Sequence, residues 1–288
     1  MKPDRRSWLP ETSPDQVVEP LEHPLPPARR WSDHAWRLLA LPMLLFFAIP
    51  VIMLFTRTSP SELLASLHMP QVQMAVLVSL RTTLVSLLVI LLLGTPLAYL
   101  MGRSKFRGKR LVDALIDLPT VLPPSVAGVA LLLTFGQSGP LGGWLETLGL
   151  QVAFTQLAVV MAQVFIAAPF YVRSAALGFA AVDVEIEEAA QLDGANRWQL
   201  LQQVILPLAR SALLTGIMLS WARALGEFGA TILFAGNYPG RTQTMPTAIY
   251  LGFEVDVQIA ITLSVILVLV SLVLLLLVKV VIARDEEG

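Results

Sequence analysis

The sequence predicts an all-α integral membrane protein with six transmembrane helices and with both the N and C termini in the cytoplasm. Hydrophobic residues make up 55% of the 288 residues, charged residues only 14%, and the mean hydropathy is +0.69. Soluble globular chains carry about 25% charged residues. Two further observations are a series of long segments without charge and the concentration of Lys and Arg in alternate connections between them.

The first 35 residues differ in composition from the rest of the chain. Seven prolines lie among charged residues here: Pro3, Pro10, Pro14, Pro20, Pro24, Pro26 and Pro27. Such a segment cannot bury enough apolar surface to fold, so residues 1–35 are expected to form a disordered cytoplasmic tail. The tail also places the first apolar segment too far from Met1 for a typical signal peptide, so that segment should remain as a membrane anchor.

About 20 apolar helical residues cross the hydrocarbon core of a bilayer. The first three segments close to this length are Leu38–Thr56, Thr82–Gly102 and about Leu118–Phe135. The first contains two prolines, which should bend it, and the second lies between two arginines. Residues 36–72 are therefore expected to hold the first transmembrane helix and an external loop.

Three more apolar segments follow, at Phe154–Val172, Ser211–Ala235 and Val257–Val278. The last is free of charge, whereas the fifth is interrupted by Arg223 and Glu227. Together with the first three segments they give six spans.

Basic residues set the predicted orientation, because loops rich in Lys and Arg remain in the cytoplasm. The connections expected inside hold Arg29, Arg30, Arg37, Arg103, Lys105, Arg107, Lys109, Arg110, Arg173, Arg197, Arg210, Lys279 and Arg284. The alternate connections are poorer, with Arg57 in the first and Arg241 in the last. This distribution places both termini, and the long connection after the fourth span, on the cytoplasmic side.

The third span opens with LPTVLPPSVAG, in which three prolines occur within six residues. Prolines remove backbone donors, and irregular backbone survives in a membrane only where it packs in protein or lines an aqueous cavity. One interpretation is a simple kinked helix end. The other places Thr120, Pro123, Pro124 and Ser125 beside a translocation path.

The fifth span carries two opposite charges four residues apart, Arg223 and Glu227, on one face of the expected helix. Each would be costly in the membrane without a partner. They are interpreted either as an intrahelical ion pair that joins helices or as a polar element of the path, together with Thr231. Gly226 and Gly229 would allow another helix to approach closely.

A charged segment lies between the fourth and fifth spans and is predicted to form a helical hairpin. Asp183 can cap its first helix, and Gly194 supplies a left-handed stop. Asn196 and Gln199 have the spacing of a capping box for a second helix, which Pro207 is expected to end. From composition alone, an ordinary amphipathic pair of surface helices would explain the segment.

The residue order within this segment resembles the EAA loop of the permeases of bacterial ABC importers. The matching residues are Glu188, Ala189, Ala190, Gly194, Val204, Leu206 and Pro207. In that family the loop is a coupling helix that docks into a groove of a cytoplasmic ATPase. The resemblance implies a coupling loop over residues 183–207, in which the ATPase contacts are Glu187, Glu188, Ala189, Ala190, Asp193 and Gly194.

The run RALGEFGAT followed by GNYPGRTQTMPTAIY is similar to permeases of molybdate, tungstate and sulfate importers, and molybdate permeases match best. The resemblance covers residues 73–283 and implies a type I importer (MetI-like) fold, with five spans in that core and a cytoplasmic tail at 284–288. It also implies a homodimer in the bacterial cytoplasmic (inner) membrane, bound to an ATPase dimer and an external or periplasmic oxyanion-binding protein. The expected substrate is molybdate, with tungstate or sulfate/thiosulfate as alternatives.

The residue inventory argues against an enzyme. Cysteine is absent, and the histidines are His23, His34 and His68. No HExxH or GxxxxGK[ST] pattern occurs, so no metal site is expected, and ATP and Mg would be bound by the partner ATPase. A secondary anion transporter remains the alternative from another class, but it would predict inverted repeats. Lipid is an expected neighbour and nucleic acid is not.

Overall fold

The computed structural model describes residues 30–286, so most of the expected disordered tail lies outside the described residues. The first helix, α1 (Arg30–Thr56), begins five residues before the predicted tail ends and contains two prolines. The chain divides into two compact units between Ile52 and Met53, and α1 supplies the described part of the first.

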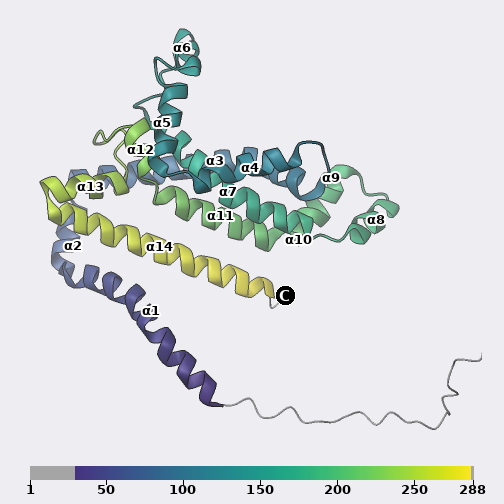
Figure 1. Ribbon diagram of the computed structural model, residues 1–288, viewed down its shortest axis with the longest axis horizontal. Helices are drawn as coiled ribbons and strands as arrows, with labels where there is room; N and C mark the ends of the chain where they lie inside the picture. Colours follow the sequence, from purple (N-terminus) through teal and green to yellow (C-terminus); the bar gives the residue numbers. More distant parts are fainter. Residues whose placement is uncertain (1–29, 287–288) are drawn as a thin grey trace, which may run out of the picture. The chain divides into compact units, whose positions relative to one another are not determined.

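The second unit is helical throughout its described part (Figure 1). The helices outside the expected hairpin and the helix that follows it are α2 (Pro60–Leu67), α3 (Pro70–Arg103), α4 (Lys109–Val121), α5 (Pro124–Phe135), α6 (Pro140–Thr147), α7 (Gln156–Ala180), α12 (Gly229–Phe234), α13 (Met245–Val255) and α14 (Val257–Glu286). The expected hairpin and the helix after it are α8 (Val184–Leu192), α9 (Arg197–Leu200), a π-helical turn at Leu201–Ile205, α10 (Leu206–Leu208) and α11 (Arg210–Leu225).

Four described helices are long and apolar enough to cross a membrane by themselves, and the total reaches six when two bent pairs count as one span each. The third predicted span is the first bent pair, because α4 and α5 meet at 115° beside Pro123. The proline cluster thus interrupts the helix, as the sequence predicts. The second pair bends by 71° between α10 and α11, around Ala209.

The fifth predicted span, Ser211–Ala235, is wrong as a continuous helix. The structure ends α11 at Leu225 and starts α12 at Gly229, so Arg223 and Glu227 do not share one helix. Gly226, which has the lowest helix propensity apart from proline, lies at the break. The helices that contain the second and sixth spans, α3 and α14, are longer than the predicted spans, because they continue beyond the apolar residues.

The core forms where α7 packs against α3 and α11. Small residues allow this close approach: Ala162, Ala167 and Ala175 of α7 are fully buried. A Cβ atom built on Gly102 of α3 would lie only 2.6 Å from the carbonyl oxygen of Ala176. Helices that associate in lipid depend on such contacts, since lipid tails are as apolar as the side chains.

Buried hydroxyl groups line the same contact. Ser79, Thr82, Thr83 and Ser86 of α3 are at most 2% exposed. The Thr82, Thr83 and Ser86 hydroxyls donate to carbonyl oxygens one turn earlier, and Ser86 Oγ also lies 2.9 Å from Gln163 Oε1 of α7. These partners satisfy polar groups that have no water nearby.

Figure 1 shows α8, α9 and α10 at one end of the group formed by α3, α7 and α11, and α12 and α13 at the other. The predicted cytoplasmic connections after the second and fourth spans therefore lie at the same end, where Arg103 pairs with Glu187. The hydrogen bond from Met245 N–H to Ser79 Oγ ties α13 to the opposite end of α3.

Replacing Gly102 with Ala should destabilise the helix core, because the new methyl group would press on backbone of α7. Overpacking of this kind costs about 1–3 kcal/mol, and about 2–4 °C in Tm accompanies each kcal/mol. Gly143→Ala is the matched control, since the new Cβ would lie 3.7 Å from the carbonyl oxygen of Gln137, which is an ordinary van der Waals contact. Thermal unfolding of the purified chain in detergent measures both. Equal Tm values for the two variants would contradict this packing.

Candidate functional site

The predicted helical hairpin is present at residues 184–208. Asp183 occupies the N-cap position of α8 with extended backbone angles, but its side chain accepts no capping hydrogen bond, so that part of the prediction is wrong. Glu185 and Glu187 lie in the first turn, where the helix dipole favours carboxylates.

The turn between α8 and α9 follows the sequence prediction. Gly194 has φ of 89°, and its N–H donates to the carbonyl of Gln191 at 3.0 Å. The N–H of Ala195 donates to the carbonyl of Ala190, also at 3.0 Å, which completes a Schellman motif. Asn196 and Gln199 form the predicted capping box at the start of α9.

Pro207 does not end the second helix of the hairpin. The chain stays helical through the π-helical turn at Leu201–Ile205 and through α10 to Leu208. In the widened turn the N–H of Leu206 bonds to the carbonyl of Leu201, five residues earlier. This widening leaves room for the proline ring, so the break moves to Ala209.

The hairpin presents apolar side chains outside the predicted spans. No residue of α8 is buried, and Ile186, Leu192 and Trp198 are 44%, 89% and 63% exposed. Ala189 is exposed on the same helix, while Ala190 packs against the core. An exposed apolar patch beside charged residues is typical of a surface that binds another protein.

Arg103, which the sequence analysis used only for orientation, anchors the hairpin to the membrane helices. Its guanidinium group donates to the carbonyl oxygens of Val182 at 2.7 Å and Phe179 at 3.3 Å, and it pairs with the carboxylate of Glu187. The two charged side chains are only 13% and 12% exposed. The sequence offered one signal for such an anchor: Arg103 ends a predicted span, and no Asp or Glu lies close to it along the chain.

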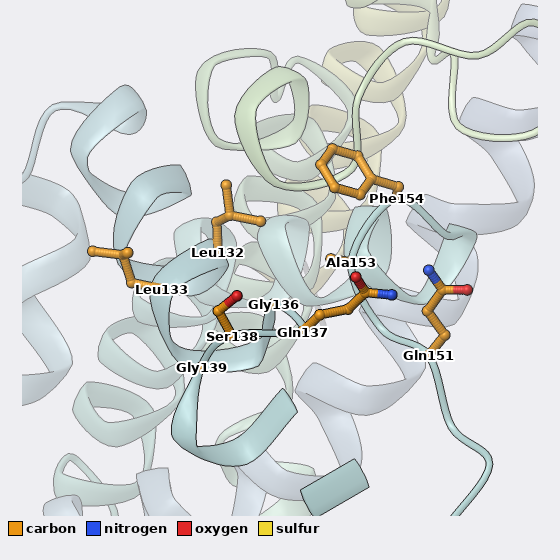
Figure 2. A pocket seen from close by; sticks show the side chains of 9 residues that line it. All are labelled: Leu132, Leu133, Gly136, Gln137, Ser138, Gly139, Gln151, Ala153 and Phe154. Carbon is orange, nitrogen blue, oxygen red and sulfur yellow. The ribbon is translucent and has the colours of Figure 1, made fainter. Parts of the chain in front are cut away.

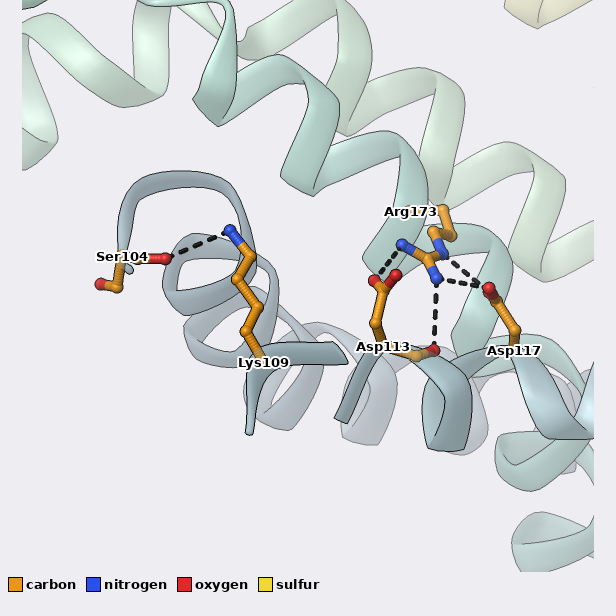
Figure 3. Close-up of polar contacts among 5 residues, drawn as sticks. All are labelled: Ser104, Lys109, Asp113, Asp117 and Arg173. Atoms are coloured by element: carbon orange, nitrogen blue, oxygen red, sulfur yellow. Dashed lines mark hydrogen bonds and ion pairs between the residues drawn. The ribbon is translucent and has the colours of Figure 1, made fainter. Parts of the chain in front are cut away.

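A second arginine of the cytoplasmic end joins α7 to α4. Figure 3 shows Arg173 between Asp113 and Asp117, which its guanidinium group contacts at 2.5 Å each. Lys109, in the same view, donates to the carbonyl of Ser104. This network was not predicted from the sequence, although Asp113 and Asp117 lie four residues apart and form one acidic helix face that needs a cation.

The second candidate site lies where the two helix breaks meet. A Cβ built on Gly229, at the start of α12, would lie 2.7 Å from Cβ of Pro124 and 3.3 Å from the backbone nitrogen of Ser125. One built on Gly128 would lie 2.8 Å from the carbonyl oxygen of Ala230. The glycines therefore let α12 lie directly against the bend between α4 and α5.

The predicted path residues divide into two groups at this junction. Thr120, Pro123, Pro124 and Ser125 are exposed on the single chain, whereas Thr231 is fully buried. The hydroxyl of Thr120 donates to the carbonyl of Asp117. An ion could therefore contact the first group without any rearrangement, but not Thr231.

Arg223 and Glu227 form an ion pair at 3.0 Å, in which Glu227 is 1% exposed and Arg223 30%. The other carboxylate oxygen of Glu227 accepts the N–H of Ala230 at 2.8 Å and so caps α12. The pair thus bridges the end of α11 and the start of α12, in place of the predicted pair within one helix. In this geometry the pair satisfies a backbone N–H group at the helix break.

A cavity lies at the end of the molecule opposite the hairpin (Figure 2). It has a volume of about 350 Å³, and its lining combines apolar side chains such as Leu132 and Leu133 with glycines and with the polar side chains of Gln137, Ser138 and Gln151. Phe154 at its rim has φ of 61°, and its N–H donates to the carbonyl of Phe234. This bond joins the start of α7 to the end of α12.

Residues 94–284 match the family described as binding-protein-dependent transport system inner membrane component. The chain belongs to this family. It is a multi-pass membrane protein of the permease type, and its helical fold is that of the type I ABC importers.

Several named relatives are similar over most of their length. The putative molybdenum transport system permease protein YvgM of Bacillus subtilis is 45% identical over 180 residues, which are 62% of this chain and 79% of the relative. The molybdenum transport system permease protein ModB of Mycobacterium tuberculosis is 38% identical over 229 residues, 80% and 85% of the two chains. A probable sulfate transport system permease protein of Chlorokybus atmophyticus is 35% identical over 230 residues, 78% and 79% of the two chains.

Two solved structures share the fold. A bacterial ABC transporter that imports alginate aligns with a TM-score of 0.69 and 18% identity, over 88% of this chain and 96% of that one. The inward-facing MetNI methionine ABC transporter aligns with a TM-score of 0.56 and 18% identity, over 73% and 94%.

Removing Arg223 alone should destabilise the protein by about 3 kcal/mol, because a buried carboxylate is left without its cation. Glu227→Gln should cost less, since its amide oxygen can still accept the Ala230 N–H and the partly exposed Arg223 can reach water. The double variant Arg223→Ala/Glu227→Gln should recover most of the loss in a double-mutant cycle.

Tm and membrane insertion are measured for each variant of this cycle. Arg241→Ala is the control, because Arg241 is exposed. If Arg223 instead guides a dianion, the double variant will insert, assemble and hydrolyse ATP with its partners yet transport nothing. That result would contradict a purely structural pair.

Proposed function

We propose that this chain is the transmembrane subunit of an ATP-driven importer that moves molybdate across the cytoplasmic membrane. The observation that carries the proposal is the exposed hairpin α8–α9, with its Schellman motif and its α9 capping box, on a chain of apolar helices. The acidic first turn of this hairpin would be costly in lipid, and its exposed apolar side chains would be costly in water. Docking to a soluble protein accounts for both.

The docked protein is proposed to be a cytoplasmic ABC ATPase, whose contacts would be Glu188, Ala189, Ala190, Asp193 and Gly194. Glu187, the sixth residue expected in this contact, is only 12% exposed and pairs with Arg103, so it would face the membrane helices instead. ATP and Mg would be bound and turned over by that partner. Closure of an ATPase dimer would move two hairpins together, which requires two copies of this chain. A homodimer is therefore part of the proposal.

Molybdate is favoured as substrate because relatives named for molybdenum transport are similar over most of the chain. Sulfate is the main alternative, since relatives named for sulfate transport are 35% identical. Both are tetrahedral dianions, and tungstate belongs to the same class. An external oxyanion-binding protein would deliver the ion and supply most of the selectivity.

The proposed path runs past the exposed bend at Pro123–Ser125. Arg223 and Glu227, at the helix break that packs against this bend, neutralise each other. A path without an unpaired cation would hold a doubly charged ion only weakly. Weak binding suits release, because the ion must leave once the cavity opens inward.

Gly194→Val should reduce uptake while membrane insertion persists. Valine at φ of 89° costs on the order of 1–2 kcal/mol, so the turn between α8 and α9 would change shape. Gly194→Asn is the permissive control, because asparagine tolerates this conformation. Gly108→Val is the second control, since Gly108 has φ of 86° in a turn outside the hairpin.

Uptake and co-purification with the ATPase are the measurements for these three variants. The coupling role is refuted if Gly194→Val performs like wild type in both assays. It is also refuted if Gly108→Val lowers both as strongly.

Cells that lack their own molybdate importer test the substrate. Supplying this chain with its ATPase and binding protein should restore uptake of radiolabelled molybdate, and excess tungstate should compete more strongly than excess sulfate. Replacing the binding protein with a sulfate-binding one tests whether the permease itself discriminates. Uptake of labelled sulfate that is insensitive to molybdate would assign the chain to sulfate import.

A further inference from the structure

We propose that Arg103 is a positioning residue that transmits movement of the hairpin helix α8 to the membrane helices α3 and α7. The inference rests on the proposed function, because it assumes that an ATPase moves α8. It goes further in naming the contact through which that movement reaches the membrane.

Arg103 occupies a position where three elements meet. It is the last residue of α3, its guanidinium group holds two carbonyl oxygens at the end of α7, and the same group pairs with Glu187 of α8. Arg103 and Glu187 are only 13% and 12% exposed, so water competes weakly for this pair. One planar cation therefore joins three helices.

Helix α8 has few other attachments to the rest of the chain. Only residues 181–183 separate it from α7, and it contains no buried residue. Ala190 packs against the core near its C-terminal end, while the pair with Glu187 lies in its first turn. Because the attachments are so few, the ion pair fixes how the first turn of α8 sits on the membrane helices.

The other side of the contact is rigid. Gly102 lets α3 touch the backbone of α7 at Ala176, and Tyr99 packs edge-on against Phe179 with ring centroids 5.5 Å apart. A force on Arg103 therefore acts on α3 and α7 together and cannot be absorbed by one side chain. A close-packed interior transmits such displacements.

The far end of α3 reaches the opposite side of the unit. Its 34 residues make a helix about 50 Å long. Near the other end, Ser79 Oγ accepts the N–H of Met245 at 2.7 Å, which connects α3 to α13. Movement of α8 can thus reach the outer end through one continuous helix.

A simpler role for Arg103 is to cap the C terminus of α7, which its contacts with Phe179 and Val182 already do. The two roles separate at Glu187, because Glu187→Gln removes the ion pair and leaves the carbonyl contacts in place. Glu185→Gln is the matched control for Glu187, since Glu185 is exposed in the same helical turn. Arg107→Gln is the control for Arg103, because Arg107 is exposed in the following loop.

The experiment uses the full chain, reconstituted in lipid with its ATPase and binding protein. Assembly, basal ATP hydrolysis and the number of molybdate ions moved per ATP are measured for each variant. We expect Glu187→Gln to assemble and hydrolyse ATP while the ions moved per ATP fall about 10-fold, a usual size for coupling between sites. Glu187→Asp, which keeps a carboxylate for Arg103, should retain part of the ratio that Glu187→Gln loses, and both controls should match wild type.

The role is refuted if Glu187→Gln keeps the wild-type ratio of ions to ATP. It is also refuted if assembly, hydrolysis and transport fall together in Glu187→Gln and fall as far in Glu187→Asp, because the pair then serves folding alone. A wild-type chain that binds no ATPase refutes the proposed function itself. If the wild-type complex transports normally and the Glu187→Gln complex moves as many ions per ATP, only the role of Arg103 is refuted.

Discussion

The rest of the structure depends on one constraint: backbone polar groups inside a bilayer have no water to bond with. Two helices of this chain nevertheless break within predicted spans, at residues 122–123 and 226–228. Both breaks survive because they lie against each other, with Gly229 on Pro124, and because Glu227 accepts the N–H of Ala230. Arg223 then neutralises the carboxylate, so the ion pair follows from the need to cap a buried helix start.

Close helix packing provides the frame that holds the junction. Hydrophobic side chains gain nothing from leaving lipid for protein, so association depends on backbone approach and on hydrogen bonds. Gly102 and the buried alanines of α7 supply the first, and the hydroxyl groups of α3 supply the second. The same frame carries the hairpin at its end, which explains why a surface helix without buried residues can still hold a fixed orientation.

The sequence predicts local features of this chain better than pairings between distant ones. The left-handed turn at Gly194, the capping box at Asn196 and the interruption at Pro123 each depend on a few neighbouring residues, and each is confirmed. The continuous fifth span is wrong, because hydropathy does not register a break that a buried carboxylate caps. Arg103 and Glu187 are 84 residues apart, so no local pattern could pair them. The proposed roles of the site residues remain predictions.

The arrangement of charge bears on how such a chain could pass a dianion. Arg173 and Arg223, which lie in the membrane helices, are each paired with carboxylates that also stabilise a neighbouring helix. An unpaired arginine at the bend would attract a doubly charged ion strongly and slow its departure. A neutral bend of prolines, small hydroxyl side chains and glycines offers backbone dipoles instead, which can replace water around the ion without trapping it. Selectivity would then rest with the protein that delivers the ion, and direction with the hairpin that is proposed to couple the helices to ATP.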